Sequence, residues 1–391
     1  MYLSILGDAN PWWTKENWEE TDKHIKTYRE SRYRHEPKWL EQISLEPFSL
    51  NFVIGPRQVG KTTGIKLLIK NLIESGVEAE RIAYIDCEIF ANFAELRECI
   101  RELLKIRRDL VLFLDEVTSL KEWWKAVKFL IDAGKLEESS VVATGSGSLR
   151  IKKDAELFPG RMGKGRLIEV LPLSFGEYIE LHGIRNYKTE YERVLEIFRK
   201  YLNTGGFLNV INGASRTEVL KGFINEIVRF SKSPEISREV LASLISKIPS
   251  ALSYRAIASE TSGYSYKLVQ EYIEFFREIY LLSVAYLKEG GRILHRREKK
   301  IFFRDPLLLR IFSEWSSTKF LESALYEGIV QEHLLRKFGE IYYYRNRYEI
   351  DCIASDMKIE VKAGKPHRRY PRGVRVLDEE ELPGFLIEMF A

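Results

Sequence analysis

The stretch Ser49–Gly64, SLNFVIGPRQVGKTTG, decides the fold of this chain, because an apolar strand runs directly into a glycine-rich loop. The loop has the spacing Gly55-x-x-x-x-Gly60-Lys61-Thr62. Glycines at its two ends let the backbone curl so that successive N–H groups face phosphate oxygens. The N-terminus of the helix expected over 61–74 favours negative charge at the same place. The stretch therefore predicts a P-loop that binds a nucleotide.

The predicted nucleotide contacts come from the whole loop and the first helical turn. Lys61 is expected to reach the β- and γ-phosphates of ATP, and the hydroxyl of Thr62 is expected to hold Mg²⁺. The residues predicted to line the nucleotide are Gly55, Pro56, Arg57, Gln58, Val59, Gly60, Lys61, Thr62 and Thr63.

Length and composition set wider limits. With 391 residues, of which 45% are hydrophobic and 30% charged, the chain predicts two or three globular domains. No apolar run reaches the roughly 18 residues of a membrane span, and the N-terminus lacks a basic signal region, so we expect a cytoplasmic protein. A net charge of +4 says little about partners. The three cysteines are widely spaced along the chain, and we expect Cys87, Cys99 and Cys352 to be reduced residues of the core.

Apolar strands alternate with helical segments between residues 47 and 170, which predicts a parallel sheet covered by helices. The third strand ends in Val111-Leu112-Phe113-Leu114-Asp115-Glu116, the pattern of a Walker B motif. We expect Asp115 to hold Mg²⁺ through water and Glu116 to polarise the attacking water. An acidic pair after a strand can also be a simple helix cap, and the P-loop upstream favours the catalytic interpretation.

Two further stretches of this region carry candidate catalytic groups. Thr144-Gly145-Ser146-Gly147-Ser148 follows the fourth strand, where Thr144 or Ser146 could contact the γ-phosphate; the alternative is a flexible turn. In the glycine-rich loop 158–166, Arg161 is our first candidate and Arg166 our second for an arginine that stabilises the transferring phosphate. That arginine could act within one chain or on a neighbouring subunit of an oligomer, or the loop could simply be solvated.

The order of these motifs resembles a known family. The P-loop, LVLFLDEV, VVATGSGS, GRMGKGRLIEV, LPLSFGEY (171–178) and TGGF (204–207) are similar to AAA-type ATPases of archaea and bacteria that carry a C-terminal restriction-endonuclease-like domain. The opening Asn10-Pro11-Trp12-Trp13 resembles archaeal members. The resemblance implies the sheet order 5-1-4-3-2. Family members usually have Gly-Gly-Phe-Pro where this chain has Gly205-Gly206-Phe207-Leu208, a change expected to affect the turn and not the chemistry.

Residues 214–315 are dominated by helical periodicity and predict a helical, winged-helix domain. Two expected helices, 253–260 and 265–279, flank a short turn as in a helix-turn-helix, and a hairpin follows as the wing. The wing is basic, with six cations against Glu289 and Glu298, so it could lie along phosphates; the alternative is a lid that only packs on the ATPase. The six cations are Lys288, Arg292, Arg296, Arg297, Lys299 and Lys300.

Residues 316–391 predict a small α/β domain of restriction-endonuclease type that begins with a helix over 318–338. Asp351 on one strand and Glu360 with Lys362 on the next match the pattern Asp…Glu-x-Lys. Strand alternation places Glu360 and Lys362 on one face, and the hairpin register decides whether Asp351 joins them. Asp351 and Glu360 are expected to bind Mg²⁺, Lys362 to steady the attacking water, and Glu332, or else Glu327, to add a ligand from the preceding helix.

The expected organisation is an aromatic arm (1–45), an ATPase domain (46–213), the winged-helix domain (214–315) and the nuclease-like domain (316–391). In the arm we expect a helix over 15–31, and aromatics that pack on the next domain, the alternative being a lid or base-stacking surface. A basic run suits a phosphate backbone and predicts DNA as a partner: Lys362, Lys365, Arg368, Arg369, Arg372 and Arg375. The function predicted is Mg²⁺-dependent ATP hydrolysis coupled to nucleic-acid binding and cleavage, or an ATP-dependent switch whose nuclease-like domain does not cleave.

Overall fold

The computed structural model describes residues 2–147, 158, 160–346, 348–364 and 370–390. The chain forms two compact units, Met1–Leu171 and Pro172–Ala391. We expected the first domain to continue to residue 213. In the structure, residues from Pro172 onward fold with the second unit because helix α7 (Phe175–Leu181) packs on helices of that unit, chiefly the last one, α16 (Leu382–Phe390).

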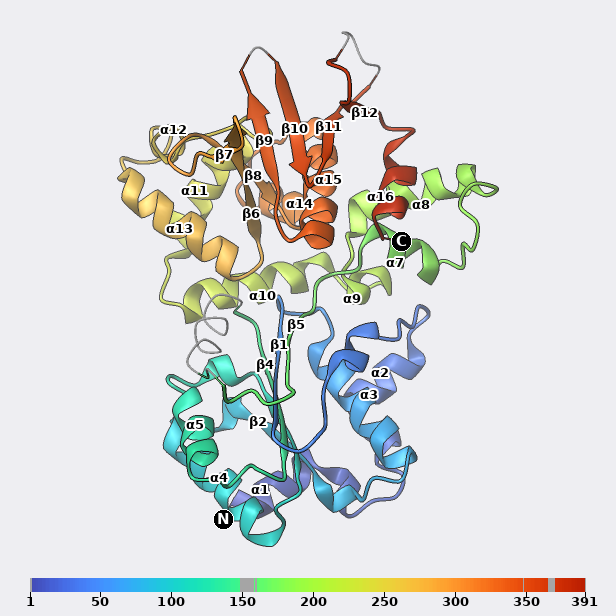
Figure 1. Cartoon of the computed structure of the whole chain (residues 1–391), viewed down its shortest axis with the longest axis vertical. Coiled ribbons are helices and arrows are strands. Elements are labelled where there is room, and N and C mark those ends of the chain that lie inside the picture. The colour runs from blue at the N-terminus through green and yellow to red at the C-terminus, as the bar shows by residue number, and fades with distance from the viewer. Residues whose placement is uncertain (1, 148–157, 159, 347, 365–369, 391) are drawn as a thin grey trace. The chain divides into compact units, whose positions relative to one another are not determined.

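The first unit is built on a five-stranded sheet in the order β2-β3-β4-β1-β5, which confirms the predicted order 5-1-4-3-2 (Figure 1). All four strand pairs are parallel, so the carboxyl ends of the strands lie at one edge. The strands are β1 (Ser49–Ile54), β2 (Ile82–Asp86), β3 (Val111–Asp115), β4 (Ser140–Gly145) and β5 (Leu167–Glu169).

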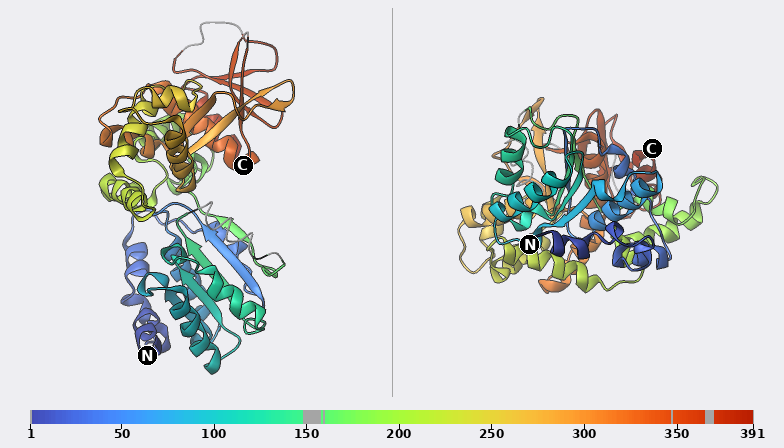
Figure 2. Two further views of the ribbon diagram at one scale, coloured as in Figure 1. Left: turned by 90° about the vertical axis from the view of Figure 1, so that its left-hand side faces the viewer. Right: turned by 90° about the horizontal axis from the view of Figure 1, so that it is seen from below.

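Helices cover both faces of this sheet (Figure 2). Alternate residues of one strand enter different cores: Phe52 packs with α4 (Phe93–Ile106) and α5 (Trp124–Asp132), while Val53 packs with α3 (Lys61–Glu74). Both faces being covered explains why the central strands are apolar without alternation. All three cysteines are buried as free thiols, as predicted.

The N-terminal arm contacts both cores of the first unit: Leu6 lies in the core with α4, whereas Trp12, Trp18 and Ile25 lie in the core with α3. It contains α1 (Tyr2–Ala9) and α2 (Lys23–Glu30), whereas we expected one helix over 15–31. The later start of α2 has a local cause, because the Asp22 carboxylate caps the helix by accepting hydrogen bonds from the backbone of His24 and Ile25. Trp12 and Trp18 are buried in the core with α3, as the packing interpretation of the arm expects.

The second unit begins with helices and ends with a mixed sheet. Its helices are α7 (Phe175–Leu181), α8 (Tyr191–Thr204), α9 (Leu208–Ile211), α10 (Arg216–Arg229), α11 (Pro234–Ile245), α12 (Tyr254–Ala258), α13 (Tyr266–Glu278), α14 (Pro306–Trp315), α15 (Glu322–Phe338) and α16 (Leu382–Phe390). Its strands are β6 (Leu282–Glu289), β7 (Arg292–Ile293), β8 (Lys299–Phe303), β9 (Tyr342–Arg345), β10 (Glu349–Ala354), β11 (Met357–Val361) and β12 (Arg375–Leu377).

The expected wing and the expected terminal domain share one sheet. Strand β6 pairs with β8 in antiparallel fashion and with β9 in parallel, so the order is β12-β11-β10-β9-β6-β7 with β8 also on β6. The parallel pairing Tyr286↔Tyr342 covers the edge of β6 that an isolated wing would leave exposed. Hydrogen bonds between strands therefore join the two segments that we expected to form separate domains, 214–315 and 316–391.

Close backbone packing joins the segment after Leu171 to the rest of the second unit. The N–H of Leu173 donates to the carbonyl of Gly206, and a Cβ on Gly206 would lie 2.1 Å from the carbonyl oxygen of Leu173. Gly176 lies against the ring of Phe390 in α16, a helix that the sequence analysis did not anticipate. These contacts give a structural role to the glycines of LPLSFGEY and TGGF.

Within the described part of the chain, none of the helices combines the length and the apolar character needed to cross a membrane.

Candidate functional site

The loop between β1 and α3 has the curled backbone that its glycines predict. Gln58 and Gly60 have φ values of 65° and 88°, and α3 begins directly at Lys61. A Cβ on Gly55 would lie 1.9 Å from the carbonyl oxygen of Val170, so glycine is needed where the loop leaves the sheet. The Lys61 ammonium is buried and donates to the carbonyls of Gly55 and Pro56, each at 2.7 Å. The lysine thus points into the concave side of the loop.

Asp115, at the end of β3, faces the first turn of α3. Its Oδ2 accepts a hydrogen bond from the hydroxyl of Thr62 at 2.8 Å, and its Oδ1 accepts one from the hydroxyl of Thr144. The carboxylate is buried and linked through hydroxyls to α3 and β4. A carboxylate beside a threonine hydroxyl, next to a phosphate-binding loop, is a donor set that fits a hydrated magnesium ion.

Glu116 follows with a left-handed backbone, φ 51°. Its N–H donates to Thr144 Oγ1 at 3.0 Å, and its Oε1 accepts hydrogen bonds from Thr118 at 2.6 Å and Ser146 at 2.9 Å. The two sequence candidates on β4 therefore contact different carboxylates, Thr144 that of Asp115 and Ser146 that of Glu116. Left-handed backbone at a glutamate costs energy, and the surrounding hydroxyls hold it.

The structure adds residues that the sequence analysis missed. The hydroxyl of Tyr84, on β2, donates to Asp115 Oδ2 at 2.7 Å; burial, and next the nearby Asp115 charge, raise the pKa of that hydroxyl. Asp86 ends β2 in register with Asp115, and its pKa is raised, chiefly by burial. Asp86 had a detectable signal, because it follows an apolar strand just as Asp115 does. Tyr84 had none, since its role depends on where its side chain points.

A buried lysine connects the N-terminal arm to this site. The ammonium of Lys66 lies 3.8 Å from the ring centroid of Tyr84, 4.7 Å from that of Trp12 and 3.7 Å from Asp22 Oδ2. Its pKa is lowered, mainly by burial. Tyr84 in turn donates to Asp115. The arm is therefore linked to the Asp115 carboxylate through the Lys66 ammonium and the Tyr84 hydroxyl.

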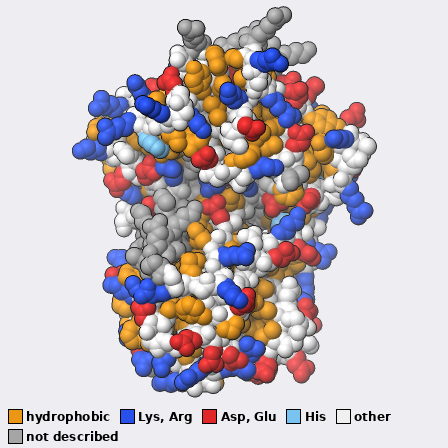
Figure 3. All heavy atoms as spheres, in the orientation of Figure 1, with side chains coloured by type: hydrophobic (Ala, Val, Ile, Leu, Met, Phe, Trp, Pro, Cys, Tyr) orange, Lys and Arg blue, Asp and Glu red, His pale blue; other side chains and the backbone are white. Residues whose placement is uncertain are grey.

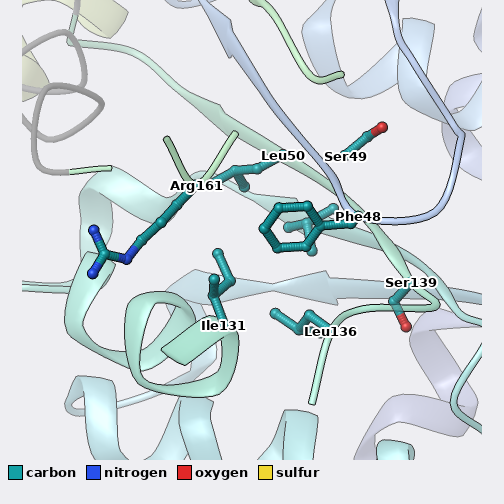
Figure 4. Close-up of a pocket in the computed structure, with 8 residues that line it drawn as sticks. Phe48, Ser49, Leu50, Ile131, Leu136, Ser139 and Arg161 are labelled. Carbon is teal, nitrogen blue, oxygen red and sulfur yellow. The ribbon is translucent and has the colours of Figure 1, made fainter. Parts of the chain in front are cut away.

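Arg161 is placed away from these residues. It lies at the rim of a small pocket lined by Phe48, Leu50 and other residues from the opposite, N-terminal edge of the sheet, and its guanidinium points away from Phe48 (Figure 4). Its Nε donates to Asp132 at 2.6 Å. Since β1 has six residues, this edge is roughly 17 Å from the P-loop. Arg161 was expected to stabilise the transferring phosphate. Within one chain, however, the structure places it far from the P-loop. Arg166 is exposed at the start of β5.

The second predicted site gathers on the sheet of the second unit. Cys352 pairs with Ile359, and this register puts Asp351 opposite Glu360 on the same face. Burial, followed by the Asp351 charge, raises the pKa of Glu360. Lys362 donates to Glu360 Oε1 at 2.6 Å, and the pKa of Lys362 is raised. The three residues therefore converge as the pattern predicted.

The helix ligand expected at this second site is corrected by the structure. Glu332 lies away from the cluster and forms ion pairs with Arg304 and Arg336, at 3.0 and 2.8 Å. The alternative, Glu327, lies in the cluster. The two positions are five residues apart, which turns them by about 140° around a helix, so they cannot face the same sheet. Among the described residues, no group of three or more His, Cys, Asp and Glu side chains is arranged to hold a metal ion.

Lysines of the expected wing are also placed differently. Lys299 and Lys300 are buried, as is every residue of β8, the strand on which both lie. Arg292, Arg296 and Arg297 are exposed. Lys and Arg side chains gather at the upper left of Figure 3, where Figure 1 has α12, α13 and β7. In the C-terminal basic run, Arg372 and Arg375 are exposed, and Lys365, Arg368 and Arg369 lie outside the described residues.

Comparisons with known proteins agree with the fold of the first unit. Residues 48–179 match the family model described as AAA domain. An uncharacterized protein of Methanocaldococcus jannaschii is 26% identical over 267 residues, which cover 62% of this chain and 57% of that protein. The family match, with the sheet order and the P-loop, supports an AAA-type ATPase domain in this part of the chain.

The solved structures to which this chain is similar share less of its sequence. The Aeropyrum pernix ORC2 protein, in ADPNP–ADP complexes, is 13% identical with a TM-score of 0.40, covering 71% of this chain and 90% of its own. Cdc6p of Pyrobaculum aerophilum is 14% identical with a TM-score of 0.30, covering 77% and 94%. Similarity at this level does not extend to function.

Proposed function

We propose that the first unit binds ATP with Mg²⁺ and hydrolyses the γ-phosphate. The observation that carries the proposal is the convergence of Thr62, Asp115, Glu116 and Thr144 at the carboxyl edge of the sheet, beside the buried Lys61. These groups come from three separate segments, the start of α3, the end of β3 and the end of β4, and only the parallel register brings them together.

Each residue has a role that follows from its position. The loop N–H groups and Lys61 would bind the phosphates, and Thr62 and Asp115 would hold magnesium, which supplies positive charge beside the β- and γ-phosphates. Glu116 would orient the attacking water and accept its proton, while Thr144 fixes the backbone from which Glu116 projects. In the structure, the Glu116 carboxylate accepts hydrogen bonds from Thr118 and Ser146, which set its direction.

The test separates hydrolysis from binding. Replacing Glu116 with Gln should lower kcat by about 10²-fold or more and leave the ATP dissociation constant within about threefold, because the side chain acts mainly in the transition state. Replacing Lys61 with Ala should instead weaken ATP binding itself. Turnover is measured by phosphate release and affinity by titration with a fluorescent ATP analogue. Wild-type turnover in Glu116→Gln would contradict the assignment.

We also propose that the second unit binds nucleic acid, with DNA as the expected partner, and that ATP hydrolysis changes how it binds. The exposed arginines Arg292, Arg296 and Arg297 support this proposal, together with the succession of α12 and α13, two helices joined by a short segment as a helix-turn-helix requires. Phosphate contacts by such side chains give affinity with little sequence preference.

If β9–β12 form a nuclease-like domain, the second unit has two candidate outputs, that is, two candidate functions. It could cleave the bound nucleic acid, or it could act as an ATP-dependent switch that does not cleave. The pairing of Asp351, Glu360 and Lys362 supports the first. Lys300, an ammonium among the carboxylates of this cluster, favours the second. Incubating the full chain with supercoiled DNA and Mg²⁺ or Mn²⁺ decides between them, since nicking that is lost in Asp351→Ala requires the first.

A further inference from the structure

The carboxylates of the second unit converge on one buried ammonium group. Lys300 Nζ lies 2.7 Å from Asp351 Oδ1, 2.9 Å from Glu327 Oε1 and 2.9 Å from Glu349 Oε1. These partners come from β10 and α15, and Lys300 itself is on β8. The side chain of Lys300 is 3% exposed. Such a group has no access to water, so its charge depends on these three oxygens.

Two of these carboxylates also accept hydrogen bonds from other groups. Asp351 Oδ2 accepts from the backbone N–H of Val361 at 3.0 Å, and Glu327 Oε1 also accepts from Gln331 at 2.9 Å. Both oxygens of Asp351 therefore already have donors. A divalent ion placed between Asp351 and Glu327 would have to displace the ammonium and lose these bonds.

We infer that Lys300 takes the position of a divalent cation in this cluster. An internal ammonium group, and not a metal ion, then bridges the nuclease-like carboxylates of the second unit. The inference bears on the two candidate outputs of the proposed function and is independent of ATP hydrolysis.

Charge alone does not decide the matter. Four carboxylates, Glu327, Glu349, Asp351 and Glu360, face the two ammonium groups of Lys300 and Lys362. The remaining negative charge could attract a cation in either case. Geometry decides, because the point shared by three carboxylates is the one that Lys300 occupies, and hard divalent cations need several oxygen ligands close to the ion, at about 2.0–2.1 Å for Mg²⁺.

Removing the ammonium should therefore create a metal site. In Lys300→Met, three carboxylate oxygens lose their common donor while the apolar stem of the side chain is kept. The experiment is a Mn²⁺ titration of the full chain, read by the loss of the free-ion electron paramagnetic resonance signal. Asp115→Asn is included in every protein, so that the P-loop site does not contribute. We expect no Mn²⁺ bound to the chain that keeps Lys300, and about one ion per chain in Lys300→Met.

Two variants make the result specific. Lys299→Met removes the neighbouring buried lysine, whose ammonium lies over the ring of Tyr254 at 4.5 Å and not in the cluster, so it should bind no Mn²⁺. Adding Asp351→Asn to Lys300→Met should abolish the gained ion. Mn²⁺ binding by the chain that keeps Lys300, lost on Asp351→Asn, would overturn the inference even if Lys300→Met fails to fold. A folded Lys300→Met chain that gains no ion would overturn it too.

Discussion

Gly205 ends helix α8 with φ 59° and ψ −161°, a conformation that residues with a Cβ rarely adopt. Its position is also crowded, because a Cβ would lie 1.9 Å from Asp305 Oδ1. That carboxylate is buried and accepts hydrogen bonds from the N–H groups of Gly206 and Leu307, both at 2.8 Å. The glycine pair thus joins the end of α8 to the start of α14.

We expect Gly205→Ala to destabilise the second unit by ~3 kcal/mol or more, since it adds backbone strain and a steric clash with Asp305. The matched control is Gly213→Ala, where φ is also positive, 97°, but no atom lies within 4 Å of the added Cβ. The control should cost only about 1–2 kcal/mol. Urea denaturation followed by circular dichroism measures both. Equal losses would mean that packing against Asp305 has no effect.

At this scale, the sequence predicted residues whose roles follow from local spacing. Lys61, Thr62 and Asp115 come together because each stands at a fixed place next to a parallel strand. Roles that depend on distant side chains could not be predicted. Tyr84 reaches Asp115 from the neighbouring strand β2, and Lys300 meets Asp351 only because β8 and β10 belong to one sheet.

Helix α15 is enclosed by protein over most of its length, with every residue from Ala324 to Leu334 buried. His333 on this helix links it to α7. Its Nδ1 donates to the carbonyl of Ile329 at 2.8 Å, and its Nε2 accepts from the N–H of Phe175 at 3.0 Å. This geometry requires a neutral ring. Burial, and then the charge of Arg336, lower the pKa of His333 to about 3, against the opposing effect of Glu177.

This buried histidine predicts a pH dependence of stability. The unfolded chain binds a proton at His333 below pH 6.5, whereas the folded chain does so only near pH 3. The contribution is therefore complete above pH 6.5 and is lost as the pH falls, by roughly 2 kcal/mol between pH 7 and 5. In His333→Gln, an amide oxygen can still accept from Phe175, and the pH slope of the unfolding free energy should be smaller. An unchanged slope would show that His333 does not titrate in this way.

The ends of elements were predictable where a local rule fixed them, as for α3, which spans Lys61–Glu74 as expected. The helix expected over 318–338 begins only at Glu322, and α16 was not predicted. The hydrophobic pattern of α15 does not indicate which face of the helix packs on the sheet, since nearly all of its faces are buried. Sequence alone therefore left Glu327 and Glu332 as alternatives, and only the packing of α15 on β10 and β11 separates them.

Across the whole molecule, the main departure from expectation is the shared sheet of the second unit. Lys299 and Lys300 on β8 are buried, and Lys300 contacts Asp351 of the expected terminal domain, so two of the six wing cations are unavailable to phosphates. Sequence could not reveal this, because strand pairing over more than 50 residues leaves no local pattern. The exposed cations Arg292, Arg296 and Arg297 remain the candidates for nucleic-acid contact.

We expect Arg296→Glu combined with Arg297→Glu to weaken duplex DNA binding by about tenfold or more at low salt and to flatten its dependence on salt, because each lost phosphate contact removes about one released counterion. Fluorescence anisotropy over a series of salt concentrations measures both effects. The matched control reverses two neighbouring exposed cations on α8, Arg199 and Lys200, which gives the same change in net charge at another place. If both pairs weaken binding equally, the effect is one of net charge alone. Since the P-loop lies in the first unit, neither pair should alter ATP hydrolysis measured without DNA. A loss of basal turnover in the Arg296/Arg297 variant alone would instead assign this segment to the lid role.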